Sequence, residues 1–351
     1  MKTKSIRICT TVLFLVGMCL LLFFATEIRQ SILQSFTLAV GTVIPSLFPM
    51  LVLSNFTVLC GLFNIQSGQC NTLMQKLFGV TAQAVPALLF SMTGGYLTGI
   101  KTVKALYEAK NISLQEAQKL CCFCVAPGLA FSITAVGDGM FASKRIGMLF
   151  FFSCTAASLL LGFFSKGKGS RPQLNTTKSS AMQPAAALCK AVAVSSEAML
   201  SMTAWMAAFS ALQTIALCLL PQKLQQIGML FFEVTRAAQT CAQNGNLSLC
   251  AAAMGFGGLC ISCQLLPDLQ TLQVNPLRFA FCRLLNGITA GCISELLTLL
   301  LPDLRLLTCA AYPVKLSNTT PLSSFFLLLA CLIFVLDLAP TKKTCYTVHG
   351  R

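Results

Sequence analysis

Phe90-Ser-Met-Thr-Gly-Gly-Tyr-Leu-Thr-Gly-Ile-Lys-Thr-Val-Lys104 is a polar interruption in a strongly apolar part of the chain. It contains Gly94, Gly95 and Gly99, and glycine lowers helix stability because it loses the most conformational freedom on folding. Three threonines add hydroxyl groups, and a lysine ends the segment. At membrane depth, irregular backbone is tolerated only where protein or a water-filled cavity satisfies its polar groups. The segment therefore predicts a broken or re-entrant helix that lines a substrate site.

The composition around this segment is that of a membrane protein. The chain has 351 residues, of which 56% are hydrophobic and 10% are charged. Its apolar runs are long enough to cross a hydrocarbon core of roughly 30 Å. The formal charge is +15, but the basic residues lie at the ends of apolar segments and in polar loops, where cytoplasmic loops carry them. We therefore expect an all-α, polytopic integral membrane protein in a lipid bilayer, with no nucleic-acid partner.

The reactive residue types do not form a recognisable catalytic or metal-binding set. Most of the 19 cysteines lie inside apolar runs, and the single histidine is His349 near the C-terminus. The clusters Cys121-Cys122-Phe-Cys124 and Cys260-Ile-Ser-Cys263 lack the further ligands of a structural zinc site. No Ser-His-Asp or Cys-His arrangement can be assembled from one histidine. We expect neither an enzyme nor a cofactor, although chemistry by carboxylates alone stays open.

The order of apolar and polar segments predicts two membrane-embedded halves. Lys2, Lys4 and Arg7 precede the first apolar run, which favours a retained helix with a cytoplasmic N-terminus; a cleaved signal peptide is the alternative. The predicted parts are a leading transmembrane helix (1–30), a first membrane repeat (31–164), a basic polar cytoplasmic linker (165–190), a second membrane repeat (191–340) and a cytoplasmic tail (341–351).

Three local patterns refine this plan. Pro45 and Pro49 each remove a backbone donor, so they predict a kinked or broken helix. Ser113 precedes Glu116 by three residues, a capping box that starts a helix, which Pro127 and Gly128 then break. Finally, Glu233 and Arg236 are spaced to pair as an intramembrane ion pair; an interfacial helix with both charges in water is the alternative.

The glycine-rich interruption has a counterpart in the second half. Aligning Gly94-Gly95 with Gly257-Gly258 matches a long span, a glycine-broken apolar segment, a polar connection and two more spans. Paired interruptions of this kind are typical of transporters built from two related, inverted helical repeats, whose site lies between the repeats. The alternative is two unrelated close contacts between membrane helices, which small residues also provide.

Several stretches resemble one known family in the same order along the chain. They are Pro45–Pro49, Gly95–Lys101, Ile112–Ala117, Phe232–Thr235 and Gly257–Gln264. Together they resemble the sporulation integral membrane proteins related to YlbJ, within the wider Gate-domain (nucleoside-recognition) superfamily. The chain departs from the usual family motif at Leu97, where proline is common, and at Ile100, where alanine is common.

The resemblance implies a role in endospore formation, in the mother-cell-derived outer forespore membrane. For relatives, it implies movement of dipicolinate from the mother cell toward the forespore. Other sporulation membrane proteins, or a second copy of the chain, would then be partners. Transport of nucleosides or another small solute is one alternative, and a membrane scaffold that transports nothing is another.

The expected site holds a small organic anion between the two glycine-broken segments. Helix N-termini carry partial positive charge and free N–H groups, so two broken helices can bind carboxylates. Tyr96 offers an aromatic face, and Lys101 either adds a point charge or lies among the lipid headgroups with Lys104. The predicted site residues are Gly94, Gly95, Tyr96, Thr98, Gly99, Lys101, Gly257, Gly258, Ser262 and Gln264.

Overall fold

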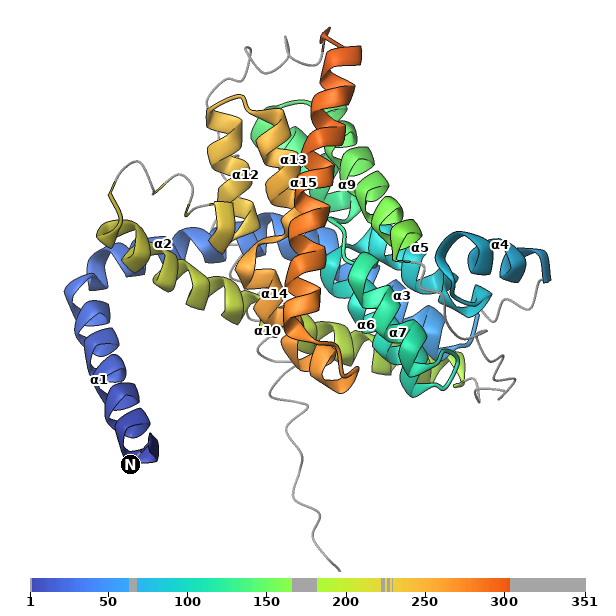
Figure 1. Cartoon of the computed structure of the whole chain (residues 1–351), viewed down its shortest axis with the longest axis horizontal. Helices are drawn as coiled ribbons and strands as arrows, with labels where there is room; N and C mark the ends of the chain where they lie inside the picture. The colour runs from blue at the N-terminus through green and yellow to red at the C-terminus, as the bar shows by residue number, and fades with distance from the viewer. Residues whose placement is uncertain are drawn as a thin grey trace, which may run out of the picture. The chain divides into compact units, whose positions relative to one another are not determined.

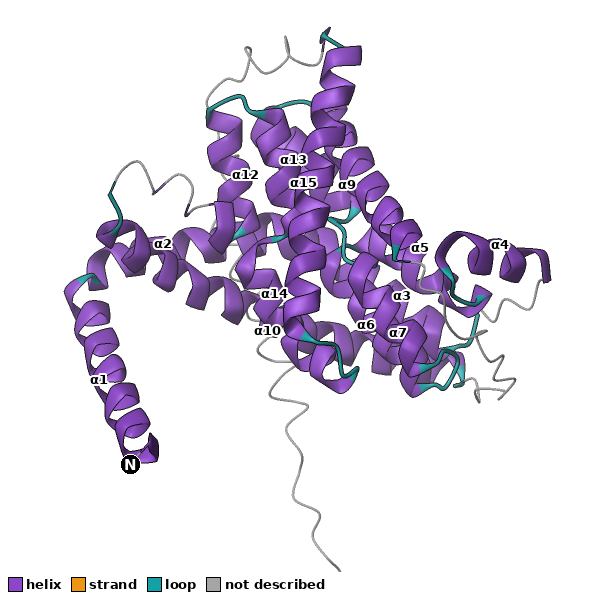
Figure 2. Ribbon diagram, in the orientation of Figure 1, coloured by secondary structure: helices purple, strands orange, loops and turns teal. Residues whose placement is uncertain are grey.

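The computed structural model describes residues 2–62, 68–165, 182–221, 225, 228 and 230–303. Every regular element in these ranges is helical, and they contain no β-strand (Figures 1 and 2). The predicted all-α fold is confirmed. The last part of the predicted second repeat (304–340), the tail 341–351 and linker residues 166–181 lie outside the described residues.

The first half of the chain forms a series of helices with several breaks. In order they are α1 (Lys2–Phe23), α2 (Ala25–Leu38), the π-helix η1 (Ala39–Val43), α3 (Ile44–Leu59), α4 (Gly68–Phe78), the 3₁₀-helix η2 (Ala82–Ala84), α5 (Val85–Gly94), α6 (Tyr96–Glu108), α7 (Leu114–Phe123), the π-helix η3 (Phe131–Asp138), α8 (Gly139–Phe141) and α9 (Lys144–Phe164).

The second half contains one long helix and a pair of short helices that meet at a break. Its elements are α10 (Pro184–Leu219), α12 (Val234–Gln243), α13 (Leu247–Phe256), α14 (Gly258–Thr271) and α15 (Pro276–Leu300). The long helix α10 packs against α2 and α3 of the first half, and α14 packs against α6 (Figure 1). The polar connections predicted after the two glycine breaks are largely helical: α6 and α7 form the first, and α14 and the start of α15 form the second.

Four helical segments are long and apolar enough to cross a membrane: Lys144–Phe164, Pro184–Leu219, Leu247–Thr271 and Pro276–Leu300. Two bent pairs, Phe14–Phe23 with Ala25–Gly41 (82°) and Gly68–Phe78 with Ala82–Gly94 (80°), meet the same criterion as broken spans or re-entrant loops. The protein is therefore an all-α polytopic membrane protein. Large exposed side chains such as Phe14, Leu22 and Phe281 suit contact with lipid.

The proline and capping predictions also hold. Helix α3, which carries Pro45 in its first turn and Pro49 in its interior, follows directly on the π-helix η1. The helix is therefore distorted near the two prolines. Ser113 and Glu116 form the predicted capping box at the start of α7. The buried Glu116 carboxylate also accepts a 2.7 Å hydrogen bond from the Thr81 N–H, which ties α7 to the segment before α5. Residues 124–128 then interrupt the helix, as Pro127 and Gly128 predict.

Two apolar clusters hold the two halves of the chain together. One cluster joins α5, α6 and α7 to α14, with Ile100, Leu120, Leu265 and Leu269 fully or nearly buried. The other joins η3 and α9 to α12, α13 and α15. Both clusters combine residues from before and after the linker, so the two breaks are held between packed elements.

Candidate functional site

Each predicted glycine break is a real interruption between two short helices. Helix α5 ends at Gly94, Gly95 has φ +92°, and α6 begins at Tyr96. Helix α13 ends at Phe256, Gly257 has φ +83°, and α14 begins at Gly258. Side chains disfavour this left-handed region of backbone space, so glycine is the residue that permits both turns.

The two breaks lie against each other. A Cβ atom added to Gly257 would meet the Tyr96 ring at 3.3 Å and the Arg283 guanidinium at 3.4 Å. The Tyr96 hydroxyl donates a 2.6 Å hydrogen bond to the backbone oxygen of Met254, in the last turn of α13. The structure thus brings together the two glycine segments that the sequence singled out.

A cavity of about 50 Å³ adjoins the breaks. Its mainly apolar wall comes from both halves of the chain and comprises Val43, Leu47, Gly95, Tyr96, Leu97, Gly128, Phe131, Met202, Met206, Glu233, Val234, Thr235, Cys260, Ile261, Gln264 and Leu265. Of the predicted site residues, Gly95, Tyr96 and Gln264 line it. The other predicted site residues belong to the same segments but lie outside the wall: Gly94, Thr98, Gly99, Lys101, Gly257, Gly258 and Ser262. The space suits a few water molecules.

Three helices begin at this cavity. Its wall includes Tyr96 and Leu97 from the start of α6, Cys260 and Ile261 from the first turn of α14, and Val234 from the start of α12. No side chain caps α6 or α14. The N-terminus of a helix carries partial positive charge, which attracts a negatively charged group.

The start of α12 already holds such a group. The buried Glu233 carboxylate accepts hydrogen bonds from the backbone N–H groups of Thr235 (3.0 Å) and Arg236 (2.8 Å). The Arg236 guanidinium points elsewhere and donates to the backbone oxygen of Ser31 at 3.1 Å and to its hydroxyl. This corrects the side-chain ion pair expected for Glu233 and Arg236: the carboxylate caps the helix, where backbone amides satisfy it, and the guanidinium binds α2.

The predicted polar side chains mostly bind groups four residues earlier in the chain. The Thr98 hydroxyl donates to the Gly94 oxygen at 3.1 Å, and the Ser262 hydroxyl donates to the Gly258 oxygen at 3.0 Å. The Gln264 amide donates to the Cys260 sulfur at 3.3 Å. These hydroxyls therefore satisfy local backbone. Of the predicted site residues, Tyr96 and Gln264 carry a polar side-chain group and line the cavity.

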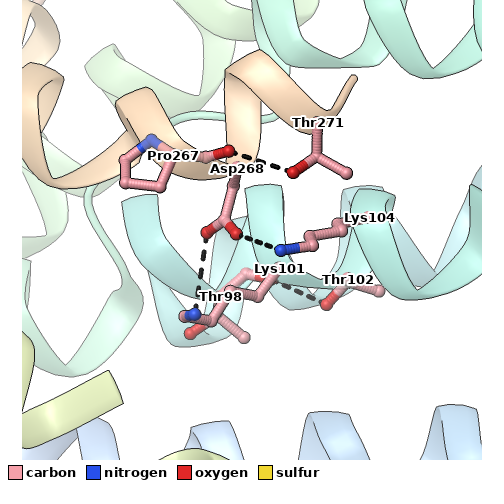
Figure 3. A network of polar contacts seen from close by, with 7 residues as sticks. All are labelled: Thr98, Lys101, Thr102, Lys104, Pro267, Asp268 and Thr271. Carbon is pink, nitrogen blue, oxygen red and sulfur yellow. Dashed lines mark hydrogen bonds and ion pairs between the residues drawn. The ribbon is translucent and has the colours of Figure 1, made fainter. Parts of the chain in front are cut away.

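Lys101 lies in an ion-pair cluster that joins α6 to α14 (Figure 3). Lys104 Nζ is 2.7 Å from Asp268 Oδ1, and Lys101 Nζ is 3.6 Å from Asp268 Oδ2. Burial opposes the charge of Lys104, but the hydrogen bond and Coulombic attraction to Asp268 outweigh it, so the pKa of Lys104 is raised above its ordinary value. Lys101 is thus paired with Asp268 and does not line the cavity.

Arg283 is a buried charge that sequence reasoning missed. Its side chain is fully buried in α15 and donates to three backbone oxygens: Phe256 at 3.0 Å, Gly255, and Val125. Two of these carbonyls end α13 at the break, where a cation is favourable.

The Tyr96 ring lies over the guanidinium, with its centroid 5.8 Å away. Asn286, one turn along α15, adds a 3.0 Å hydrogen bond to the Gly255 oxygen. Arg283 therefore fixes the second break in place.

Metal and thiol groups add nothing to this arrangement. Within the part of the chain that the structure describes, no three His, Cys, Asp or Glu side chains are grouped to hold a metal ion. No disulfide is found among the cysteines of that part of the chain.

Comparison with known proteins gives no relative. The chain matches no family model, no curated protein and no solved structure.

Proposed function

We propose that the protein is a membrane transporter that moves a small organic anion through the cavity between its two glycine breaks. The observation that carries the proposal is that the first residues of α6 and α14, two helices that no side chain caps, line one cavity from both halves of the chain. Paired broken helices at a repeat interface are how many transporters build their substrate sites. Helix N-termini bind carboxylates and phosphates without needing a buried cation for each negative charge.

The cavity must widen for transport. With about 50 Å³ of space it holds a few waters but not an aromatic dicarboxylate. The elements around it suit such a movement, because α5 and α6, like α13 and α14, are short helices joined at a single glycine. Hinges are commonly a few residues at the ends of elements that absorb backbone rotation.

The substrate and the membrane in this proposal rest on the family resemblance. Under it, the anion is dipicolinate and the protein acts in the outer forespore membrane during sporulation. Tyr96 and Phe131, which line the cavity, are the aromatic side chains that would contact a pyridine ring. The proposal makes the protein a carrier and not an enzyme.

Uptake by purified protein in liposomes tests the proposal. Labelled dipicolinate, succinate and uridine are compared side by side, with protein-free liposomes as the control. We expect protein-dependent uptake of dipicolinate, weaker uptake of succinate and none of uridine. Uptake of uridine alone would contradict anion transport. Uptake of none of the three, by folded protein, would favour the membrane scaffold.

A further inference from the structure

The Lys101–Asp268–Lys104 cluster lies one helical turn from the cavity on both helices that form it. On α6, Lys101 follows the cavity residue Leu97 by four positions. On α14, Asp268 follows the cavity residue Gln264 by four positions. Residues four apart on a helix share one face. The cluster therefore joins the two helices directly beyond one end of the cavity.

The charges in the cluster are unbalanced. Each oxygen of the single Asp268 carboxylate faces a different ammonium group, as Figure 3 shows. Glu108, one turn from Lys104 on α6, and Glu197 on α10 act on Lys104 only through longer-range attraction. Two lysines thus share one carboxylate in direct contact, and the cluster keeps an excess of positive charge.

The exposure of the three side chains is also unequal. Asp268 is 9% exposed, whereas Lys101 and Lys104 are 26% and 29% exposed. The anion is therefore enclosed between the helices, while both cations remain within reach of a solute. Because Asp268 is buried, loss of its lysine partners without replacement would be strongly destabilising, so an incoming carboxylate must take over both lysine contacts as it displaces Asp268.

We propose that Lys101 and Lys104 form the docking site for a substrate carboxylate, and that Asp268 is an internal carboxylate that occupies this site until the substrate replaces it. The inference rests on the proposed function, because it assumes an anionic substrate. A carboxylate that bridges the two lysines takes over the contacts of Asp268. The link between α6 and α14 then opens, and with it this end of the cavity. The cluster would select anions, and binding of an anion would open this end of the cavity.

Equilibrium binding of labelled dipicolinate to the full chain in lipid nanodiscs tests the proposal. Asp268→Asn removes the internal competitor, so we expect its Kd to fall about threefold to tenfold. Lys101→Gln and Lys104→Gln remove docking charges, so each Kd should rise by a similar factor. Asp138→Asn, at an exposed position in η3, is the matched control and should leave the Kd unchanged. A purely structural ion pair would give weaker binding in all three cluster variants.

The outcomes separate this inference from the proposed function. If wild-type protein neither binds nor transports a dicarboxylate, the proposed function fails. If it does both, and folded Asp268→Asn binds dipicolinate no more tightly than wild type, only the docking proposal is overturned. Should Asp268→Asn fail to fold, the lysine variants still decide, because unchanged affinity in both would overturn the proposal.

Discussion

The Tyr96 hydroxyl donates a 2.6 Å hydrogen bond to the backbone oxygen of Met254, 158 positions further along the chain. The bond joins the first residue of α6 to the last turn of α13, so it links the two glycine breaks directly. Beside it, Tyr96 also covers Gly257 and lies over the Arg283 guanidinium. The Tyr96 side chain thus contacts the end of α13, the glycine of the second break and the buried arginine that holds that break.

Tyr96→Phe tests this link with the smallest possible change. The ring keeps its packing, but the buried Met254 oxygen loses its hydrogen bond, so the free energy of unfolding should fall by about 1–2 kcal/mol. Thermal or denaturant unfolding in detergent measures the difference. Tyr107→Phe on the same helix is the control, since no hydrogen bond from its half-buried side chain is found among the described residues. Equal stability of the two variants would show that the link contributes nothing.

Gly99→Ala should disrupt the packing of α6. Its new Cβ would overlap the backbone oxygen of Cys124 and lie 2.9 Å from the Ser91 Cβ. Backbone cannot move aside as easily as a flexible side chain, so we expect a loss of roughly 1–3 kcal/mol. Gly17→Ala in α1, where nothing lies within 4 Å of the added carbon, is the matched control and should be neutral or slightly stabilising. The melting temperatures of the two variants test this prediction, and equal melting temperatures would contradict it.

Arg283→Met should destabilise the second break more than any other single change on α15. It leaves the carbonyls of Val125, Gly255 and Phe256 without the guanidinium, at a cost of about 1–3 kcal/mol for each carbonyl that finds no new donor. Arg283→Lys should rescue little, because one ammonium group cannot reproduce the planar fork. Arg278→Met on the exposed start of α15 serves as the control. Wild-type yield and stability of Arg283→Met would contradict this role.

Local sequence signals predicted much of this fold. The capping box of Ser113 and Glu116, the interruption at Pro127 and Gly128, and the glycine breaks all depend on residues close together in the chain. Backbone preference alone sets such features, so sequence patterns reveal them. The prediction that the two glycine breaks lie together is confirmed by the contacts of Tyr96 with Met254 and Gly257.

The long-range contacts could not be predicted in the same way. Arg283 binds backbone oxygens, and any residue has these, so no side-chain pattern marks its partners. Asp268 lies 164 positions from Lys104, and nothing near it in the sequence suggests a lysine partner. The spacing of Glu233 and Arg236 suits an ion pair, but Glu233 begins α12, where backbone N–H groups bind its carboxylate instead.

The Lys104–Asp268 pair predicts a pH dependence confined to alkaline solution. Because the folded protein raises the pKa of Lys104, the pair's contribution is fully present below the ordinary lysine value of 10.5 and is lost as pH rises through the folded pKa. The difference in melting temperature between wild type and Lys104→Gln should therefore stay constant from about pH 7 to 9 and shrink above about 10.5. A difference that already changes near neutral pH would point to another group.

Dipicolinate uptake by a cavity-filled variant tests the central claim most directly. Ile261 lines the cavity on α14, so Ile261→Trp should fill the space of about 50 Å³, whereas Leu259→Trp adds the same side chain at a position of α14 that is 42% exposed. Uptake into liposomes is measured for both variants and for wild type, at equal amounts of folded protein. If the anion passes between the glycine breaks, Ile261→Trp should lose at least about tenfold in initial rate, which corresponds to 1.36 kcal/mol in the barrier, and Leu259→Trp should keep the wild-type rate. Equal, wild-type uptake by both variants would show that the anion takes another route.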